Sequence, residues 1–377
     1  MLVHICCSVD SHYFLSELQK VYPDEKLIGF FYNPNIHPKG EYDLRLNDVK
    51  RSCQMLEIEL LEGEYSIDEW FDAVRGMEDE PEKGERCLKC FDIRLIRSAI
   101  ESQRRQEKTF TTTLLSSPMK EQEKLFSQGD KIAQDFNLEF IKVNFRSNGG
   151  VQKQNALAKK DNLYRQNYCG CYFALSKQRK KQNKISLEML SDLSEKKPLG
   201  SIEDRIQTFK KRDLFEEQKR PYILTQKRFQ VYRVIKSLLQ DENKNLINHY
   251  TLANSHSKKI SKIEEIIWVK PDLKIQNVLR QKYIEGNFNI GFSQKDSTQF
   301  VLLDFINLIF DKDFKTITDL KKMPLSFDEE LELRKILSGN GSQNPIVILE
   351  YQITQNVFIE IEGIFQEENI FKVVPIL

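Results

Sequence analysis

Cysteine is missing from the second half of this 377-residue chain, since all seven cysteines lie at or before Cys171. The N-terminus has no basic region followed by a long apolar stretch, so export is not expected. The longest apolar run, residues 300–310, is too short and too interrupted to cross a bilayer. We therefore expect a cytoplasmic protein with no membrane partner. In a reducing compartment, clustered cysteines more often bind metal or do redox work than form structural disulfides.

A strong net charge is also missing, because 57 Lys and Arg residues face 56 Asp and Glu residues. This balance neither requires nor excludes a nucleic-acid partner. Between Phe140 and Lys184, however, eleven Lys and Arg residues accompany one acidic residue, Asp161. Such a run is either a surface that contacts phosphates or the solvated face of helices.

Short apolar runs alternate with helical patterns in the first half of the chain. We expect strands near residues 2–5, 27–32, 58–61, 109–114 and 139–144, and helices near 11–21, 41–56, 66–75, 88–105 and 121–136. This alternation predicts a parallel α/β sheet in a domain spanning residues 1–185. Residues 186–220 are densely charged and predict a helical connector. Residues 221–377 mix both patterns and predict a second, α+β domain that ends in a hairpin of residues 355–363 and 364–374.

Three polar segments follow predicted strands directly. They are the Cys6-Cys7 pair, the loop over residues 33–37 and the turn over residues 116–118. In open parallel sheets, ligands bind beyond the carboxyl ends of the strands. We therefore expect these segments to meet at one edge of the sheet.

Six of the seven cysteines come in close pairs, which favours metal binding over structural thiols. Cys87 and Cys90 form a C-x-x-C at the head of a predicted helix, and Cys169-Gly-Cys171 is tighter than the usual zinc spacing. Side chains of neighbouring residues in an extended segment point opposite ways, so Cys6 and Cys7 predict two separate centres. Iron is favoured over zinc because surplus thiolates suggest redox work.

Two nearby residues are open to different interpretations. Asp10 follows the first pair and is either a helix N-cap or a carboxylate that ligates metal or donates a proton. Cys53 lies on a predicted helix and is more typical of a core thiol than of a ligand.

Five blocks of the sequence, taken in order, resemble the signatures of the QueH-type epoxyqueuosine reductases. They are His4-Ile-Cys-Cys7, residues 31–38 with Glu41, Tyr42 and Arg45, Gly84-Glu-Arg-Cys87 with Cys90, residues 110–114 with Ser117-Pro118, and residues 164–171. The resemblance covers about residues 1–180. One departure is Ser8-Val9, where the family often has Ala-Pro.

The resemblance implies a cobalamin-independent oxidoreductase that converts epoxyqueuosine to queuosine at the wobble position of tRNA. It also implies a Rossmann-like (HUP/PP-loop-like) fold holding a [4Fe-4S] cluster and an additional mononuclear iron, fed by an unidentified electron donor. The implied metal ligands are Cys6, Cys7, Asp10, Cys87, Cys90, Cys169 and Cys171. We hypothesise that Cys87, Cys90 and one of Cys6 and Cys7 hold the cluster, and that Cys169, Cys171, Asp10 and the other N-terminal thiol hold the second iron.

Substrate recognition is expected from the loops at the strand ends. Asp10, His37 and Tyr32 are the candidate catalytic residues, and Tyr32 and Tyr42 are candidates for stacking on the modified base. Arg45, Arg146 and Arg165 are candidates for binding anticodon-loop phosphates, and the remaining candidate substrate-binding residues are Asn33, Asn35, Thr112, Ser117 and Gln166. Tyr32 has the alternative of being core, and Arg45 that of a salt bridge on its own helix.

Two alternatives come from other functional classes. ATP-pyrophosphatase sulfur transferases carry a glycine-rich loop with Asp-Ser after the first strand, but here Cys-Cys-Ser-Val replaces the glycines that would cradle phosphate. The second alternative is a non-catalytic zinc module that binds RNA. The resemblance carries no function over to the second half of the chain.

Overall fold

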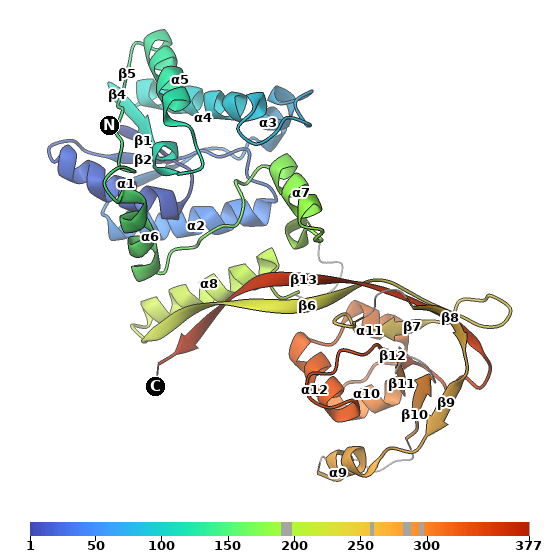
Figure 1. The fold of residues 1–377 in the computed structure, drawn as a ribbon. Helices are drawn as coiled ribbons and strands as arrows, with labels where there is room; N and C mark the ends of the chain where they lie inside the picture. Colours follow the sequence, from blue (N-terminus) through green and yellow to red (C-terminus); the bar gives the residue numbers. More distant parts are fainter. Residues whose placement is uncertain (190–197, 257–259, 282–287, 294–297, 377) are drawn as a thin grey trace. The chain divides into compact units, whose positions relative to one another are not determined.

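The computed structural model describes residues 1–189, 198–256, 260–281, 288–293 and 298–376. The chain divides into two compact units, residues 1–189 and residues 190–377 (Figure 1). Residues 190–197, which belong to the predicted connector, lie outside the described residues.

The first unit alternates strands and helices along the chain. Its elements are β1 (Leu2–Ile5), α1 (Ser8–Val21), β2 (Ile28–Phe31), α2 (Lys39–Met55), β3 (Glu59–Glu62), α3 (Ile67–Ala73), α4 (Glu85–Arg104), β4 (Thr109–Thr112), the 3-10 helix η1 (Thr113–Ser116), α5 (Gln122–Asp135), β5 (Glu139–Phe140), α6 (Gly150–Lys160), α7 (Tyr172–Lys181) and the 3-10 helix η2 (Leu187–Met189). The strands form one parallel sheet in the order β3-β2-β1-β4-β5.

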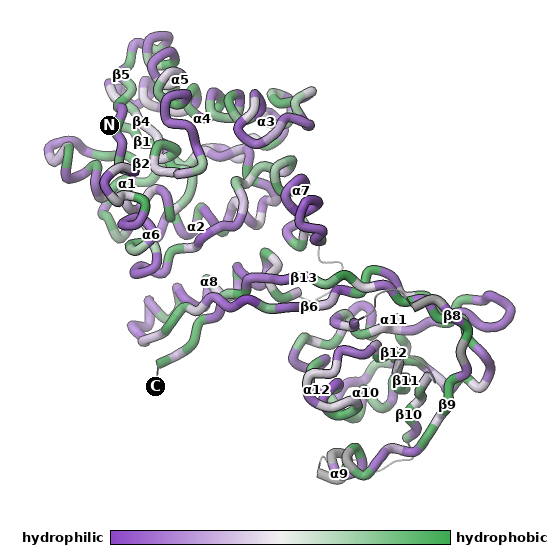
Figure 2. Tube along the Cα trace, viewed as in Figure 1, coloured by the Kyte–Doolittle hydropathy of each residue, from purple (hydrophilic) through white to green (hydrophobic). Residues whose placement is uncertain are grey.

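The central strands of this sheet are buried on both faces. All four residues of β1 and all four of β2 are buried, as expected when helices cover both sides of a parallel sheet. Helix α4 packs on β1 and β4 beside α5, whereas α1 packs with α2 and α6. Figure 2 shows hydrophobic residues along these strands and hydrophilic residues along the outer turns of the helices.

The strand order fixes where a ligand can bind. The chain moves outward in one direction from β1 to β2 and β3, and in the other direction from β4 to β5. Loops that leave β1 and β4 therefore diverge and open a crevice beyond their carboxyl ends. The predicted parallel α/β architecture is confirmed, and it places Cys6-Cys7 and the segment after Thr112 at this crevice.

The second unit combines a mixed sheet with a long two-stranded ribbon. Its elements are α8 (Ile202–Glu217), β6 (Tyr222–Gln240), β7 (His249–Thr251), β8 (Ile260–Glu264), β9 (Ile266–Val269), α9 (Leu273–Gln281), β10 (Ile290–Ser293), β11 (Gln299–Leu302), α10 (Leu303–Phe310), α11 (Ile317–Lys322), α12 (Phe327–Leu337), β12 (Ile346–Leu349) and β13 (Val357–Pro375). One sheet has the order β7-β12-β11-β10-β9 and the other β6-β13-β8. The predicted α+β character of this half is confirmed.

The predicted hairpin over residues 355–374 is wrong. Residues Val357–Pro375 form the single strand β13, which pairs antiparallel with β6 along its length. Gly363, the last residue of the first predicted segment, lies at a β-bulge where the register shifts. A glycine between two apolar runs fits either a turn or a β-bulge, and the partner strand lies more than a hundred residues earlier.

The helix in the predicted connector is α8. Its N-cap Ser201 accepts a hydrogen bond from the backbone of Asp204. Its apolar side packs against β13, where the rings of Phe209 and Phe371 meet edge to face with their centroids 5.3 Å apart. The helix thus packs within the second unit.

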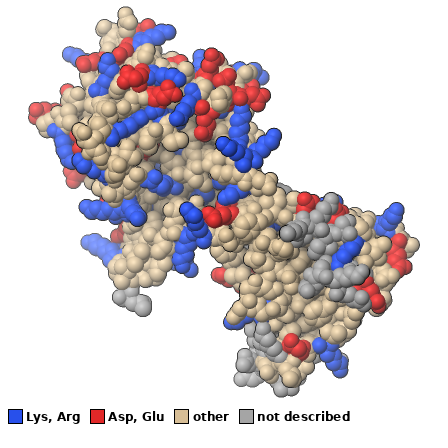
Figure 3. Space-filling view, viewed as in Figure 1, with Lys and Arg blue, Asp and Glu red and all other residues tan. Residues whose placement is uncertain are grey.

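The distribution of charged residues on the surface agrees with the net charge of +1. Both signs of charge are spread over both units on the face drawn in Figure 3. Among the described residues, no helix is long and apolar enough to cross a membrane.

Candidate metal and active site

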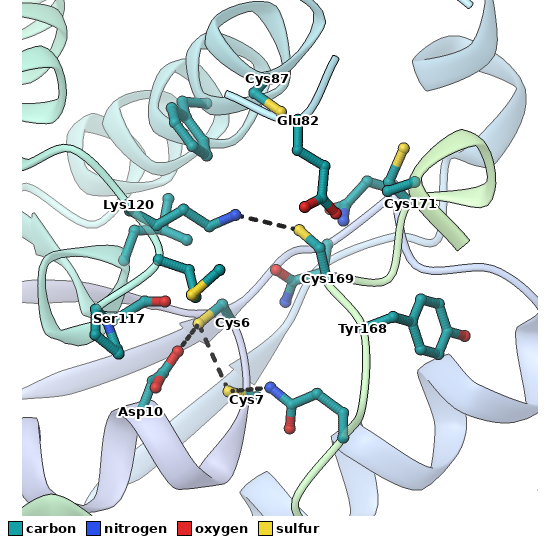
Figure 4. Close-up of a pocket in the computed structure, with 18 of the residues that line it drawn as sticks. Cys6, Cys7, Asp10, Glu82, Cys87, Ser117, Lys120, Tyr168, Cys169 and Cys171 are labelled. Atoms are coloured by element: carbon teal, nitrogen blue, oxygen red, sulfur yellow. Dashed lines mark hydrogen bonds between the residues drawn. The ribbon is translucent and has the colours of Figure 1, made fainter. Parts of the chain in front are cut away.

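A cavity of about 470 Å³ lies beyond the carboxyl ends of β1, β2 and β4 in the first unit (Figure 4). Five thiols line it, together with Asp10 and an excess of cationic side chains over acidic ones. These residues are Cys6, Cys7, Cys87, Cys169, Cys171, Asp10, Arg45, Lys83, Arg86, Arg94, Lys120, Lys124, Arg165, Glu82 and Glu121. The sheet edge therefore gathers thiols from three separate segments of the chain.

Cys6, Cys7 and Asp10 form one group at the start of α1. The Sγ atom of Cys6 lies 3.8 Å from Sγ of Cys7 and 3.7 Å from Oδ2 of Asp10. One ligand atom from each residue lies within 4.8 Å of the others, which is a spacing that can hold a metal ion. Burial raises the pKa of Asp10, although hydrogen bonds from both thiols oppose this rise.

This geometry corrects two expectations. The two neighbouring thiols do not point to opposite sides, because the chain turns from β1 into α1 at Cys7, which is the N-cap. Since Cys7 occupies that position, the N-cap interpretation of Asp10 is wrong, and the carboxylate lies in the first turn of the helix.

The other four paired cysteines lie on the α4 and α7 side of the cavity. Cys87 and Cys90 are in the first two turns of α4, and Cys171 is the N-cap of α7. Cys90 is buried among Trp70, Cys171 and neighbouring apolar side chains and is not part of the cavity lining. Burial raises the pKa of Cys171 to about 12 and raises that of Cys87.

Cys169 has a different electrostatic environment. Its Sγ accepts a hydrogen bond of 3.3 Å from Nζ of Lys120, as Figure 4 shows. Burial acts to raise the pKa of this thiol, but the charges of Lys120 and Arg94 outweigh it, so the pKa is lowered. These charges therefore stabilise the thiolate form of Cys169 relative to an ordinary thiol.

Two buried guanidinium groups leave hydrogen-bond donors without partners. Arg86 donates through Nη1 to the carbonyls of residues 77, 78 and 80, and Arg94 donates through Nε to the carbonyl of Cys90. Nη2 of each arginine is buried and has no hydrogen-bond partner among the described residues. Because both arginines line the cavity, they favour an anionic occupant.

The segment that carries Cys169 and Cys171 is fastened to α2 by buried polar contacts. Arg45 pairs with Glu41 at 2.7 Å and donates to the carbonyls of Tyr168 and Cys169. Glu41 also accepts from the hydroxyl of Tyr164 at 2.9 Å. Arg45 is therefore not a phosphate ligand as predicted, because its donors are committed inside the protein and hold the thiol segment in place.

Five further predicted residues lie outside the cavity lining, namely Tyr32, Tyr42, His37, Thr112 and Arg146. Tyr32 is 3% exposed, and its ring stacks on Phe30 with centroids 5.9 Å apart. Tyr42 is equally buried and packs on Phe31 at 5.2 Å. Neither ring is accessible to a base, so the core alternative holds for Tyr32 and the stacking prediction for both is wrong.

His37 and Thr112 make contacts within the protein outside the cavity. The ring of His37 packs on Tyr172 at 5.4 Å, and burial lowers its pKa. The hydroxyl of Thr112 caps η1 at Leu114 and bonds His4 at 2.8 Å. These contacts position the loops after β2 and β4 and leave neither side chain in the cavity.

Arg146 is likewise outside the cavity lining. It donates to the carbonyls of Leu114, Leu115 and Lys120, and so supports the loop that carries Ser117 and Lys120. The remaining predicted residues do line the cavity, namely Asn33, Asn35, Ser117, Arg165 and Gln166. Of these, Gln166 donates to Sγ of Cys7 at 3.0 Å.

Several cavity residues were not among those singled out from the sequence. Arg86 and Arg94 lie four residues before and after Cys90 on α4, a helical spacing that places all three on one face. Lys120 follows the predicted Ser117-Pro118 turn closely and could have been found from that position. Gln154 on α6 carries no such signal.

Comparisons with known proteins agree with this site. The sequence profile described as "Epoxyqueuosine reductase QueH" matches residues 1–177. A curated relative of the same description from Helicobacter pylori is 42% identical over 98% of this chain and 99% of its own length. The chain belongs to the QueH family. It is thus an epoxyqueuosine reductase, an oxidoreductase that reduces epoxyqueuosine to queuosine, and the predicted family is confirmed.

Other matches differ in how much of the chain they cover. A QueH relative from Thermotoga maritima is 36% identical over 49% of this chain and 95% of its own length. The Helicobacter pylori QueH protein extends over both units, so the second unit is shared with at least one other family member. A solved U34-tRNA thiolase NcsA from Methanococcus maripaludis, with its [4Fe-4S] cluster, gives a TM-score of 0.23 and 12% identity over 54% of this chain and 80% of that one. A TM-score this low is no measure of a shared cofactor.

Proposed function

We propose that this QueH enzyme removes the epoxide oxygen of epoxyqueuosine within tRNA, at the cavity of the first unit, with iron–sulfur chemistry. The observation that carries the proposal is the convergence of Cys6, Cys7, Asp10 and the Cys87, Cys169 and Cys171 thiols on a single crevice. Surplus thiolates of this kind suit iron–sulfur centres, which are held by cysteine thiolates.

The donor set fits two metal groups. Cys87, Cys90, Cys169 and Cys171 supply the four thiolates that a [4Fe-4S] cluster takes, and they lie on the α4 and α7 side. Cys6, Cys7 and Asp10 form the second group and would hold a mononuclear iron. This division replaces our sequence-based hypothesis, which separated Cys6 from Cys7 and joined Asp10 to Cys169 and Cys171.

The cationic side chains also support this assignment. A cluster with four thiolate ligands is anionic, and the charges of Lys120 and Arg94 lie close to these thiols. The unpartnered Nη2 atoms of Arg86 and Arg94 are donors for such an occupant. Both arginines are nearly inaccessible to solvent, so their charges are weakly screened.

The overall reaction takes two electrons and two protons, opens both carbon–oxygen bonds of the epoxide, and yields an alkene and water. When bound, the two iron centres supply the electrons and a Lewis acid for the epoxide oxygen. An external electron donor restores them, and dithionite stands in for it in the assay below.

The side chains of the cavity would bind and orient the substrate. A volume of about 470 Å³ lies in the usual range of small-molecule pockets, and the metal groups and the reacting end of a splayed-out nucleotide would share it. Asn35 lines the cavity with a buried Oδ1 atom that has no hydrogen-bond partner among the described residues, as does Gln166 with its Oε1. These two acceptors are free to receive donors from the modified base.

Two further parts of the cavity lining would have separate roles, namely phosphate binding and the exclusion of water. Arg165 is exposed and lines the cavity, so it is available for an anticodon-loop phosphate. Phe91, Leu114 and Ile36 give the wall an apolar part. Such a wall excludes water and strengthens electrostatic interactions within the site.

Anaerobic incubation of the full chain with epoxyqueuosine-containing tRNA and dithionite, followed by nucleoside mass spectrometry, tests the proposal. The modified nucleoside should lose one oxygen, and this loss should disappear with Cys171→Ala. Cys53→Ala is the matched control, because Cys53 is a core thiol that does not line the cavity. Wild-type protein that leaves the epoxide intact, or Cys171→Ala protein that turns over normally, would refute the proposed function.

A further inference from the structure

One glutamine joins Asp10 to the neighbouring structure on the side away from the thiols. Nε2 of Gln154 donates to Oδ1 of Asp10 at 2.8 Å. Oε1 of the same amide accepts from the hydroxyl of Ser116 at 2.6 Å. Because Ser116 holds the amide oxygen, the NH2 group is turned toward Asp10. The other carboxylate oxygen, Oδ2, is the atom that lies 3.7 Å from Cys6.

The position of Gln154 is set by a close approach of α6 to the loop before it. Gly149 begins the helix with φ of +78°, and a Cβ on Gly150 would lie only 1.7 Å from the carbonyl oxygen of Phe145. The two glycines therefore allow the N-terminus of α6 to lie close to the loop before it, and the helix packs against α1. Gln154 is then 3% exposed, and so its amide is not shared with solvent.

The same pattern holds for the other members of the group. Thr113 donates to Sγ of Cys6 at 3.5 Å, and Gln166 donates to Sγ of Cys7 at 3.0 Å. Each of the three candidate ligands thus receives one neutral donor from outside the group. On the cluster side, by contrast, Cys169 receives a charged donor from Lys120.

We propose that Gln154 is a positioning residue for the second metal of the reaction: it occupies Oδ1 of Asp10 and presents Oδ2 to the metal that Cys6 and Cys7 share. The inference rests on the proposed function, since it assigns a role toward that metal. Partners of metal ligands fix the orientation of the ligand, and their loss typically costs about 10- to 100-fold in metal affinity. Ser116 contributes indirectly, because its hydroxyl donates to the Gln154 amide oxygen and orients the amide.

Cobalt(II) is a suitable probe, because its charge-transfer absorption reports bonding to thiolates. The full chain is first loaded anaerobically with its cluster and then titrated with Co²⁺, and the dissociation constant and the absorption per bound Co²⁺ are recorded. Gln154→Met keeps the length of the side chain and removes both amide groups. Gln152→Met is the matched control, as Gln152 lies on the same helix and is exposed.

We expect Gln154→Met to raise the dissociation constant about 10- to 100-fold, with unchanged cluster sulfide and unchanged thiolate absorption per bound Co²⁺. Ser116→Ala should raise the constant less, and Gln152→Met should leave it unchanged. A Gln154→Met constant within twofold of the wild-type value would overturn the inference alone. Wild-type protein that binds no Co²⁺ would overturn the second metal site, and the inference with it. If Gln154→Met does not fold, Ser116→Ala decides between the same outcomes.

Discussion

Replacing Gly170 with alanine should disturb the site from a position between two of its thiols. Gly170 has φ of +108°, a region that costs a residue with a Cβ of the order of 1–3 kcal/mol. The added Cβ would also lie 2.9 Å from Cγ1 of Ile36 and 3.2 Å from Nη1 of Arg45. Ile36 is 1% exposed and Arg45 is held by its ion pair, so neither can yield easily. The backbone must shift instead, and Cys169 and Cys171 shift with it.

Gly76→Ala is the matched control for this change. Gly76 has φ of +82°, and a Cβ there would meet nothing within 4 Å. The positive φ should cost both variants about 1–3 kcal/mol of unfolding free energy, measured by urea titration of tryptophan fluorescence, and Gly170→Ala should lose more because of its contacts. Only Gly170→Ala should also lose iron and sulfide and most of its epoxide reduction. Wild-type iron content and activity in Gly170→Ala would refute the reasoning that this glycine positions the two thiols.

Three other predictions follow from buried groups. Tyr32→Phe should leave the KM for tRNA unchanged, because the ring lies in the core. If Tyr32→Leu instead raised the KM with little loss of stability, the ring would have a base-stacking role. Arg45→Met should lower the unfolding free energy by about 3–5 kcal/mol, because it leaves the Glu41 carboxylate without its charge partner in the interior. In denaturant titrations, the double variant Arg45→Met, Glu41→Gln should recover part of that loss. Burial lowers the pKa of His249, so below about pH 6.5 the unfolded chain binds a proton at this ring more readily than the folded second unit does. Its unfolding free energy, followed by Trp268 fluorescence, should fall as the pH decreases from 7.5 to 5, and His249→Gln should flatten this fall.

The sequence was sufficient for the sheet because its strands are short apolar runs between helices with clear periodicity. The predicted strand at residues 2–5 matches β1, and the helix predicted near residues 41–56 matches α2 within two residues. The order of the strands in the sheet, by contrast, cannot be predicted from a local sequence signal. The crevice between the ends of β1 and β4 depends on which strands pair, yet the paired cysteines indicated the correct edge.

Side-chain direction was harder to predict than position. Cys6 and Cys7 were placed in an extended segment, but the helix begins one residue after Cys7, and that turn brings both thiols to one side. The sequence predicts Tyr32 and Tyr42 as recognition residues, although Tyr32, directly after β2, and Tyr42, on α2, both lie in the core. A single sequence does not distinguish a buried aromatic at a strand end from an exposed one.

The charged residues of the site escaped prediction for a related reason. Arg94 and Lys120 both act through space on Cys169, which lies at least 49 residues further along the chain. Conversely, Arg45 and Arg146 resembled phosphate ligands, but the fold commits them to backbone carbonyls. Whether an arginine binds a ligand or supports a loop is decided by the acceptors that surround it.

Iron and acid-labile sulfide per chain, measured on anaerobically purified wild-type, Cys7→Ala and Cys171→Ala protein, test the two-group metal site most directly. We predict about five iron and about four sulfide per wild-type chain, the sum of one [4Fe-4S] cluster and one iron. Cys7→Ala should keep the sulfide and lose the additional iron, because Cys7 groups with Cys6 and Asp10. Cys171→Ala should lose sulfide, because Cys171 lies with Cys90 on the cluster side. Stoichiometric zinc without sulfide in the wild-type protein, or equal loss of sulfide in both variants, would contradict the account.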